Sequence, residues 1–174
     1  NESGSFDETM TVTRCPAFGV NSVRCTGSAL PGVTVQSLVA SISESQTSGV
    51  SAFRVTRTGS TAASLTVNLT VSGSATPGAG VSSTCGGPDY LTLPSTVTIP
   101  QQTDHIDISL VPFNDSFSEP NQTVIVGIAS ASDNAYIVGT PRTATVTITD
   151  DDPLPEMKIL GRSFLKGLLN NSTI

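Results

Sequence analysis

The stretch TVTITDDDPLPE, residues 145–156, decides the fold and also raises the question of function. Its first half alternates threonines with the apolar side chains of Val146 and Ile148, which is the pattern of a β-strand with one buried face. It then runs directly into the consecutive aspartates Asp150, Asp151 and Asp152. Neighbouring like charges repel, and the end of a strand does not require them. The stretch therefore predicts a half-buried strand that ends in a functional acidic group.

The same alternation recurs through the middle of the chain. In SLTVNLTVSG, residues 64–73, the side chains of Leu65, Val67, Leu69 and Val71 would share one face. Turn-forming residues separate the short segments, and none of these segments has a convincing helical period. Further strands are predicted at 33–43, 51–59, 90–99, 105–113, 123–130 and 143–149. The pattern predicts an all-β fold, a two-sheet antiparallel β-sandwich.

Both ends of the chain differ from this central domain, which spans 33–153. Residues 1–32 are interpreted as an N-terminal arm with one strand-like piece. Residues 154–174 form a C-terminal tail in which Met157, Leu160, Phe164 and Leu168 fall at helical spacing. Two glycines in the tail weaken the helix interpretation, so an extended arm is the competing reading.

Composition and charge limit the possible partners. The chain has 24 serines, 24 threonines and a net charge of −6, and both of its lysines lie in the tail. An acidic body argues against nucleic acid, because binding phosphate requires lysine and arginine. It is compatible with cations. No apolar run approaches the ~18 residues that a membrane-spanning helix needs.

Two further signals favour an extracellular, secreted protein. Six of the eight asparagines begin an Asn-X-Ser/Thr glycosylation sequon, which are Asn1, Asn68, Asn114, Asn121, Asn170 and Asn171. This is more than the serine and threonine content alone would give. The chain also has three cysteines, and in an oxidising compartment one disulfide is expected. Cys15 and Cys25 flank a short turn and are the easiest pair to close, while Cys25–Cys85 remains an alternative.

Acidic residues gather at predicted strand ends and in the loops beside them. Glu44 ends the first strand, Asp89 lies in GGPDY, and Asp115 and Glu119 lie in FNDSFSEPNQT. In a meandering sandwich several of these ends converge with the aspartates 150–152, and a bare group of this kind would repel itself. Ca²⁺ relieves the repulsion because it takes six to eight oxygen ligands in tolerant geometry. Aspartates also cap backbone N–H groups in turns, so a strand-end role without an ion is the alternative.

The order of these motifs resembles a known family. SISESQTSGVSAFRVTRTG, a Gly/Ala loop closing in PDY, LVPFNDSFSEPNQTVIVGI and TATVTITDDDP follow one another as in a Calx-β domain. That family is a calcium-binding, immunoglobulin-like β-sandwich found in sodium–calcium exchangers and in many extracellular adhesion and matrix proteins. The resemblance covers about residues 33–153, and the motifs are specific in combination rather than singly.

The resemblance implies a set of calcium ligands and two departures from the family pattern. Asn114 stands where strong binders have Asp, and Gln122 stands where they have Glu, so fewer or weaker ions are expected, in the extracellular affinity range. Asn114 also begins a sequon, and a glycan there would conflict with ligation. The implied side-chain ligands are Glu44, Asp89, Asp115, Glu119, Asp150, Asp151 and Asp152, with the amides of Asn114 and Gln122 and the backbone carbonyl of Phe117.

We interpret the chain as non-enzymatic. Its one histidine, His105, is expected on a strand surface, and no serine or cysteine lies in a nucleophile-elbow pattern. The first hypothesis is a calcium-stiffened structural or adhesive module. The second is a subunit of an extracellular filament or sheath that self-associates by strand donation through residues 1–32 and 157–174, with calcium as a rigidifier or absent.

Overall fold

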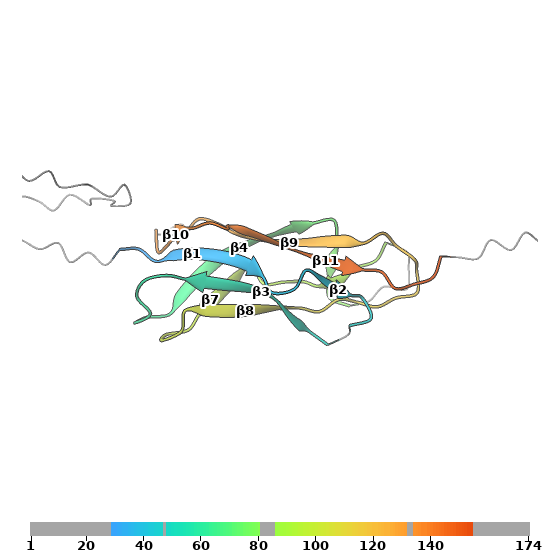
Figure 1. The fold of residues 1–174 in the computed structure, drawn as a ribbon, viewed down its shortest axis with the longest axis horizontal. Coiled ribbons are helices and arrows are strands. Elements are labelled where there is room, and N and C mark those ends of the chain that lie inside the picture. The colour runs from blue at the N-terminus through green and yellow to red at the C-terminus, as the bar shows by residue number, and fades with distance from the viewer. Residues whose placement is uncertain (1–28, 47, 81–85, 132–133, 155–174) are drawn as a thin grey trace, which may run out of the picture.

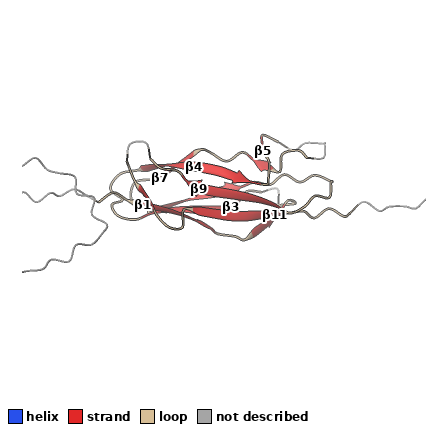
Figure 2. Cartoon of the chain, turned by 90° about the horizontal axis from the view of Figure 1, so that it is seen from above, coloured by secondary structure: helices blue, strands red, loops and turns tan. Residues whose placement is uncertain are grey.

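The structure is a computed structural model that describes residues 29–46, 48–80, 86–131 and 134–154. The described residues form two facing β-sheets (Figures 1 and 2). One sheet has the order β10 (Ile137–Val138), β1 (Gly32–Ser37), β3 (Val50–Arg57), β8 (His105–Leu110). The other has the order β2 (Ser41–Ser43), β11 (Thr143–Thr149), β9 (Gln122–Ile128), β4 (Leu65–Gly73), β7 (Thr96–Ile99). The short strands β5 (Pro77–Gly78) and β6 (Tyr90–Leu91) pair separately. The predicted all-β sandwich is confirmed.

Most neighbouring strands are antiparallel, as predicted. The parallel pairs involve the shortest strands and are β1 with β10, β2 with β11, and β5 with β6. The core lies between the two sheets and is filled by alternate residues of each strand. On β4, Leu65, Val67 and Leu69 are buried while Thr66 and Thr70 are exposed. Burying such an aliphatic side chain contributes about 1.5–3 kcal/mol, so this face fixes the register of β4.

The predicted strand 33–43 is in fact two strands in different sheets, which is a correction. Val33 and Val35 of β1 face the core, and after the break Ile42 of β2 faces it. The chain crosses between the sheets at residues 38–40, where Leu38 N–H donates to Ala52 O at 2.8 Å and Thr147 N–H donates to Ala40 O at 3.1 Å. The inward positions therefore change from odd to even residue numbers, a phase change that a single strand could not have.

Two other expectations were also too simple. The predicted strand 90–99 divides into β6 and β7, with Pro94 between them, and proline interrupts a hydrogen-bonded ladder. The short strand β10 was not predicted at all.

No helix in the described part of the chain is long and apolar enough to cross a membrane.

The sandwich is elongated, and its two described ends leave at opposite poles (Figure 1). β1 begins at Gly32 near one pole, and β11 ends at Thr149 near the other. Most of the predicted arms, residues 1–28 and 155–174, lies outside the described residues. This includes the tail 157–174 proposed for self-association.

Candidate metal centre

The pairing of β2 with β11 brings the first and last acidic segments together. These strands are parallel neighbours, with Ser43 opposite Thr149, so they end side by side. Glu44 N–H continues the pairing by donating to Thr149 O at 3.0 Å. Because Ile42 faces the core, Glu44 two residues later points inward as well and is 8% exposed. A glutamate at an inward strand position is thus placed beside Asp150, which follows β11.

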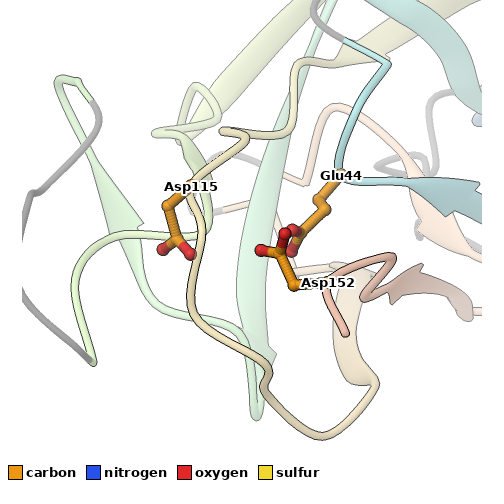
Figure 3. Close-up of side chains that lie close together, drawn as sticks. All are labelled: Glu44, Asp115 and Asp152. Carbon is orange, nitrogen blue, oxygen red and sulfur yellow. The ribbon is translucent and has the colours of Figure 1, made fainter. Parts of the chain in front are cut away.

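Two overlapping groups of side chains meet at this pole. In the first, one carboxylate oxygen from each of Glu44, Asp115 and Asp152 lies within 4.8 Å of the others (Figure 3). The second surrounds a cavity of about 10 Å³, which is room for a single water-sized particle. We call the members of both groups the acidic pole: Glu44, Asp89, Asp115, Glu119, Gln122, Asp150 and Asp152. The cavity wall is completed by Phe113, Pro120 and Ile148.

Several oxygens of the acidic pole are buried without a partner. Among the described residues, the buried side-chain atoms that lack a hydrogen bond are Glu44 Oε1, Gln122 Oε1, Asp150 Oδ1 and Asp152 Oδ2. All four belong to the acidic pole, and all four are acceptors. A buried acceptor without a donor is costly, and a buried carboxylate without a counter-charge is more so. A hard cation would satisfy them, so the residues present fit a calcium ion.

Other oxygens of the pole are already held by donors from the protein. Asp89 Oδ2 accepts a hydrogen bond from Thr76 N–H at 2.6 Å, and Asp115 Oδ1 accepts one from Phe117 N–H at 2.8 Å. Asp150 Oδ2 accepts from Ser118 Oγ at 3.4 Å. These contacts fix the loops against one another and orient the carboxylates. These acidic side chains therefore hold a loop through an oxygen that accepts a hydrogen bond, keep an oxygen without a partner, or do both.

The electrostatics of the pole are visible at Glu44. Burial, followed by repulsion from Asp150, Asp152, Asp115 and Asp151, raises the pKa of Glu44 to about 7. Desolvation and like charges both disfavour the ionised carboxylate. A bound dication would act in the opposite direction by favouring the charged form.

Three of the predicted ligands lie outside both groups. Asp151 is exposed, between two aspartates that are not. Asn114 is exposed, and its Nδ2 donates to Asp115 O at 3.4 Å. Phe117 donates its N–H to Asp115, and its carbonyl is not among the grouped ligand atoms. Their roles as ligands stay predictions.

Two polar neighbours that support the pole were not predicted from the sequence. Ser118 holds Asp150 Oδ2, and Asn121 Oδ1 accepts a hydrogen bond from Asp150 N–H at 3.3 Å. Neither residue has a pattern of its own that marks it for this role. Asn121 was singled out only as the start of a sequon, and its side chain is exposed.

The remaining predicted modification sites divide by location. Asn68 is half-buried, and its Nδ2 donates to Ser130 O at 3.5 Å, whereas Asn114 is exposed. Their glycosylation stays a prediction. The other predicted sites lie outside the described residues, namely Cys15, Cys25, Cys85, Asn1, Asn170 and Asn171.

Comparison with known proteins decides the family. The Calx-beta domain family model matches residues 31–152, which span both sheets and the acidic pole. The chain belongs to the Calx-beta domain family. The match agrees with the extent predicted from the motifs. No significant match to this Calx-beta chain is found among curated proteins.

Solved structures support the fold of this Calx-beta domain. The apo form of the Calx CBD1 domain is 17% identical, with a TM-score of 0.52 over 71% of this chain and 99% of that one. CBD12 from CALX1.2 is 17% identical, with a TM-score of 0.52, and the match covers 70% of this chain but 45% of that chain. The calcium binding domain CBD12 of CALX1.1 is 20% identical, with a TM-score of 0.50 over 68% and 44%. At these identities the likeness concerns the fold alone.

Proposed function

We propose that this Calx-beta domain binds calcium at the acidic pole. The observation that carries the proposal is the set of four buried oxygens without hydrogen-bond partners, all at one end of the sandwich. Calcium–oxygen distances are about 2.3–2.6 Å, so two ligands on opposite sides of an ion are roughly 5 Å apart. The oxygens of Glu44, Asp115 and Asp152 lie within 4.8 Å of one another, so all three could contact one ion. When bound, the ion would supply the positive charge that this pole lacks.

The binding would be of modest strength. Gln122 lines the cavity and has an amide in place of a carboxylate, and Asn114 is exposed. Calcium affinity follows ligand charge and site rigidity. We therefore expect a Kd of about 10⁻⁴–10⁻³ M, the range of extracellular calcium modules rather than that of cytosolic sensors. Glu44 belongs to both groups of the pole, which would give two adjacent places for an ion.

The proposed role is structural and non-enzymatic. An ion at the pole would link the end of β2, the loops that contain Asp89 and Asp115, and the end of β11. The cavity of about 10 Å³ has no room for an organic substrate, whose binding sites are typically hundreds of Å³. The six sequons support an extracellular location, where calcium is abundant enough to occupy a weak site. A calcium-stiffened module of an extracellular protein is thus the function we favour.

Calorimetric titration of calcium tests this proposal. We expect saturable binding by the wild-type protein, and a loss of at least tenfold in affinity for Asp152→Asn, which removes a charge from a buried, unpartnered oxygen. Asp104→Asn is the matched control, because Asp104 is exposed near the other pole and accepts a hydrogen bond from His105. Absence of binding by the wild-type protein would refute the calcium proposal. A Kd below about 10⁻⁶ M would instead contradict the expectation of weak binding.

A further inference from the structure

Glu119 and Gln122 form a side-chain pair at the start of β9, on the wall of the cavity. Gln122 Nε2 donates to Glu119 Oε2 at 3.1 Å. The other Glu119 oxygen, Oε1, accepts a hydrogen bond from Gly86 N–H at 3.1 Å. Both oxygens of this carboxylate are therefore held by donors from the protein. Glu119 differs in this respect from Glu44, Asp150 and Asp152, each of which keeps a buried oxygen without a partner.

The pair determines how the Gln122 amide is oriented. A carboxylate only accepts hydrogen bonds, so the NH₂ group of Gln122 must be the end that faces Glu119. The amide oxygen then points the other way. Gln122 Oε1 is buried, has no hydrogen-bond partner, and belongs to a residue that lines the cavity with Glu44 and Asp150. Without the Glu119 carboxylate, nothing in these contacts would prevent the amide from turning its NH₂ group toward the cavity.

The contact with Gly86 gives Glu119 a fixed position. Gly86 has a φ of +77°, a left-handed conformation that glycine adopts without strain. Its N–H belongs to the loop that leads to Asp89, which lines the same cavity. Glu119 therefore connects the Asp89 loop to the start of β9.

We propose that Glu119 is a positioning residue which aims the Gln122 carbonyl oxygen at the calcium ion, and that Glu119 is not itself a ligand. The inference rests on the proposed calcium function and refines it, since the sequence had suggested both residues as ligands. It explains how an amide can serve where a carboxylate would be expected. The neighbouring carboxylate supplies the orientation, and the amide supplies the oxygen.

A swap of the two side-chain types tests the proposal at constant net charge. In the double variant Glu119→Gln/Gln122→Glu, Gln at 119 still accepts from Gly86 and donates to Glu at 122. A carboxylate oxygen then faces the ion in place of the amide oxygen. We expect calorimetry to show calcium binding about tenfold tighter than in the wild-type protein. In Glu119→Gln alone, the NH₂ group of Gln at 119 would face the NH₂ group of Gln122. We expect this variant to bind calcium about tenfold more weakly than the wild-type protein.

The alternative role makes a different prediction for the swap. If both residues were ligands, the swap would exchange one charged and one neutral ligand and leave the affinity within about twofold. If Glu119 were the only ligand of the two, the swap would weaken binding. Either result would overturn the proposal. Equal unfolding temperatures of the calcium-free proteins would show that the variants are folded.

A calcium-free measurement separates this inference from the proposed function. In ¹H–¹⁵N spectra of the protein in chelator, the side-chain NH₂ signals of Gln122 should shift in Glu119→Gln and stay unchanged in the control Asp104→Asn. Unchanged signals in Glu119→Gln would refute the pairing, whether or not the wild-type protein binds calcium. Shifted signals with no calcium binding would leave the pairing intact and refute the calcium proposal alone.

Discussion

At the scale of single residues, Glu44 explains most about the acidic pole. Its side chain is buried because it continues the inward face of β2, and its Oε1 has no partner among the described residues. A position on the core side of a strand normally holds an apolar side chain. The chain instead places a carboxylate there, at the point where four aspartates surround it. This arrangement is electrostatically unfavourable in the calcium-free protein, and a bound ion would relieve the repulsion.

This arrangement predicts a pH dependence of stability in the absence of calcium. The pKa of Glu44 rises from 4.5 to about 7 on folding, so between these values the folded protein retains a proton that the unfolded chain has lost. The contribution of Glu44 to stability is therefore greatest below about pH 4.5 and declines until about pH 7. Glu44→Gln removes the decline. In urea denaturation with chelator, the free energy of unfolding of Glu44→Gln relative to wild type should rise by roughly 3 kcal/mol from pH 4 to pH 8.

Asp104→Asn is the control, because the hydrogen bond with His105 lowers the pKa of Asp104 and this carboxylate therefore does not titrate between pH 4.5 and pH 7. Parallel pH profiles for Glu44→Gln and the wild-type protein would show that Glu44 is not held in a repulsive environment. Saturating calcium should flatten the difference, because the ion favours the ionised carboxylate in the folded state.

The acidic residues of the site could be recognised from the sequence, but their individual roles could not. Glu44, Asp115 and the 150–152 aspartates were expected at one end of the sandwich, and the structure brings Glu44, Asp115 and Asp152 together. Which oxygens are free depends on donors from distant loops, such as Gly86 for Glu119 and Thr76 for Asp89. Those donors are backbone N–H groups, which every non-proline residue has, so no residue type marks them.

At the scale of strands, alternation predicted those elements that have one buried face. β11 follows its apolar periodicity along its length. β4 follows it from Leu65 to Leu69, but Val71, predicted on the same face, is exposed. The crossing between β1 and β2 was missed because the apolar residues continue through it, and only the change from odd to even inward positions records it. That crossing matters for the site, since it is β2 rather than β1 that lies beside β11 and carries Glu44 to Asp150.

The close approach of β4 to β9 supports the site from the other side. At Gly73 the backbone has a φ of +131°, and a Cβ there would overlap the carbonyl oxygen of Thr123. The contact is fixed by Thr123 N–H donating to Ser74 Oγ at 2.9 Å and by Ala75 N–H donating to Thr123 O at 3.0 Å. It thereby holds the residue that follows Gln122.

We therefore predict that Gly73→Ala lowers the free energy of unfolding by about 2 kcal/mol or more. Gly80→Ala is the matched control, because no atom lies within 4 Å of a Cβ built there and Gly80 has no positive φ. Urea denaturation of the two variants measures the difference. Equal stability of Gly73→Ala and Gly80→Ala would mean that β4 and β9 separate easily at this point.

At the scale of the whole molecule, the two poles of the sandwich differ in how their buried charged side chains are compensated. Arg57 is buried near the pole where β1 begins, and it donates to the carbonyl oxygens of Thr103, Ala63 and Pro100 at 3.0, 2.7 and 3.2 Å. That cation is satisfied by the protein itself. The acidic pole has the unpartnered acceptors, and it lies where the described chain leaves the domain at residue 154 (Figure 1). An ion at this end would therefore stiffen the exit of the chain from the sandwich.

The most direct test of the calcium account is a crystal structure of the protein grown with calcium, with an anomalous difference map. We predict a peak in the cavity of the acidic pole, about 2.3–2.6 Å from the free oxygens of the Glu44 and Asp150 carboxylates and of the Gln122 amide. The absence of a peak at high calcium concentration, with these carboxylates turned toward separate regions of solvent, would contradict the account.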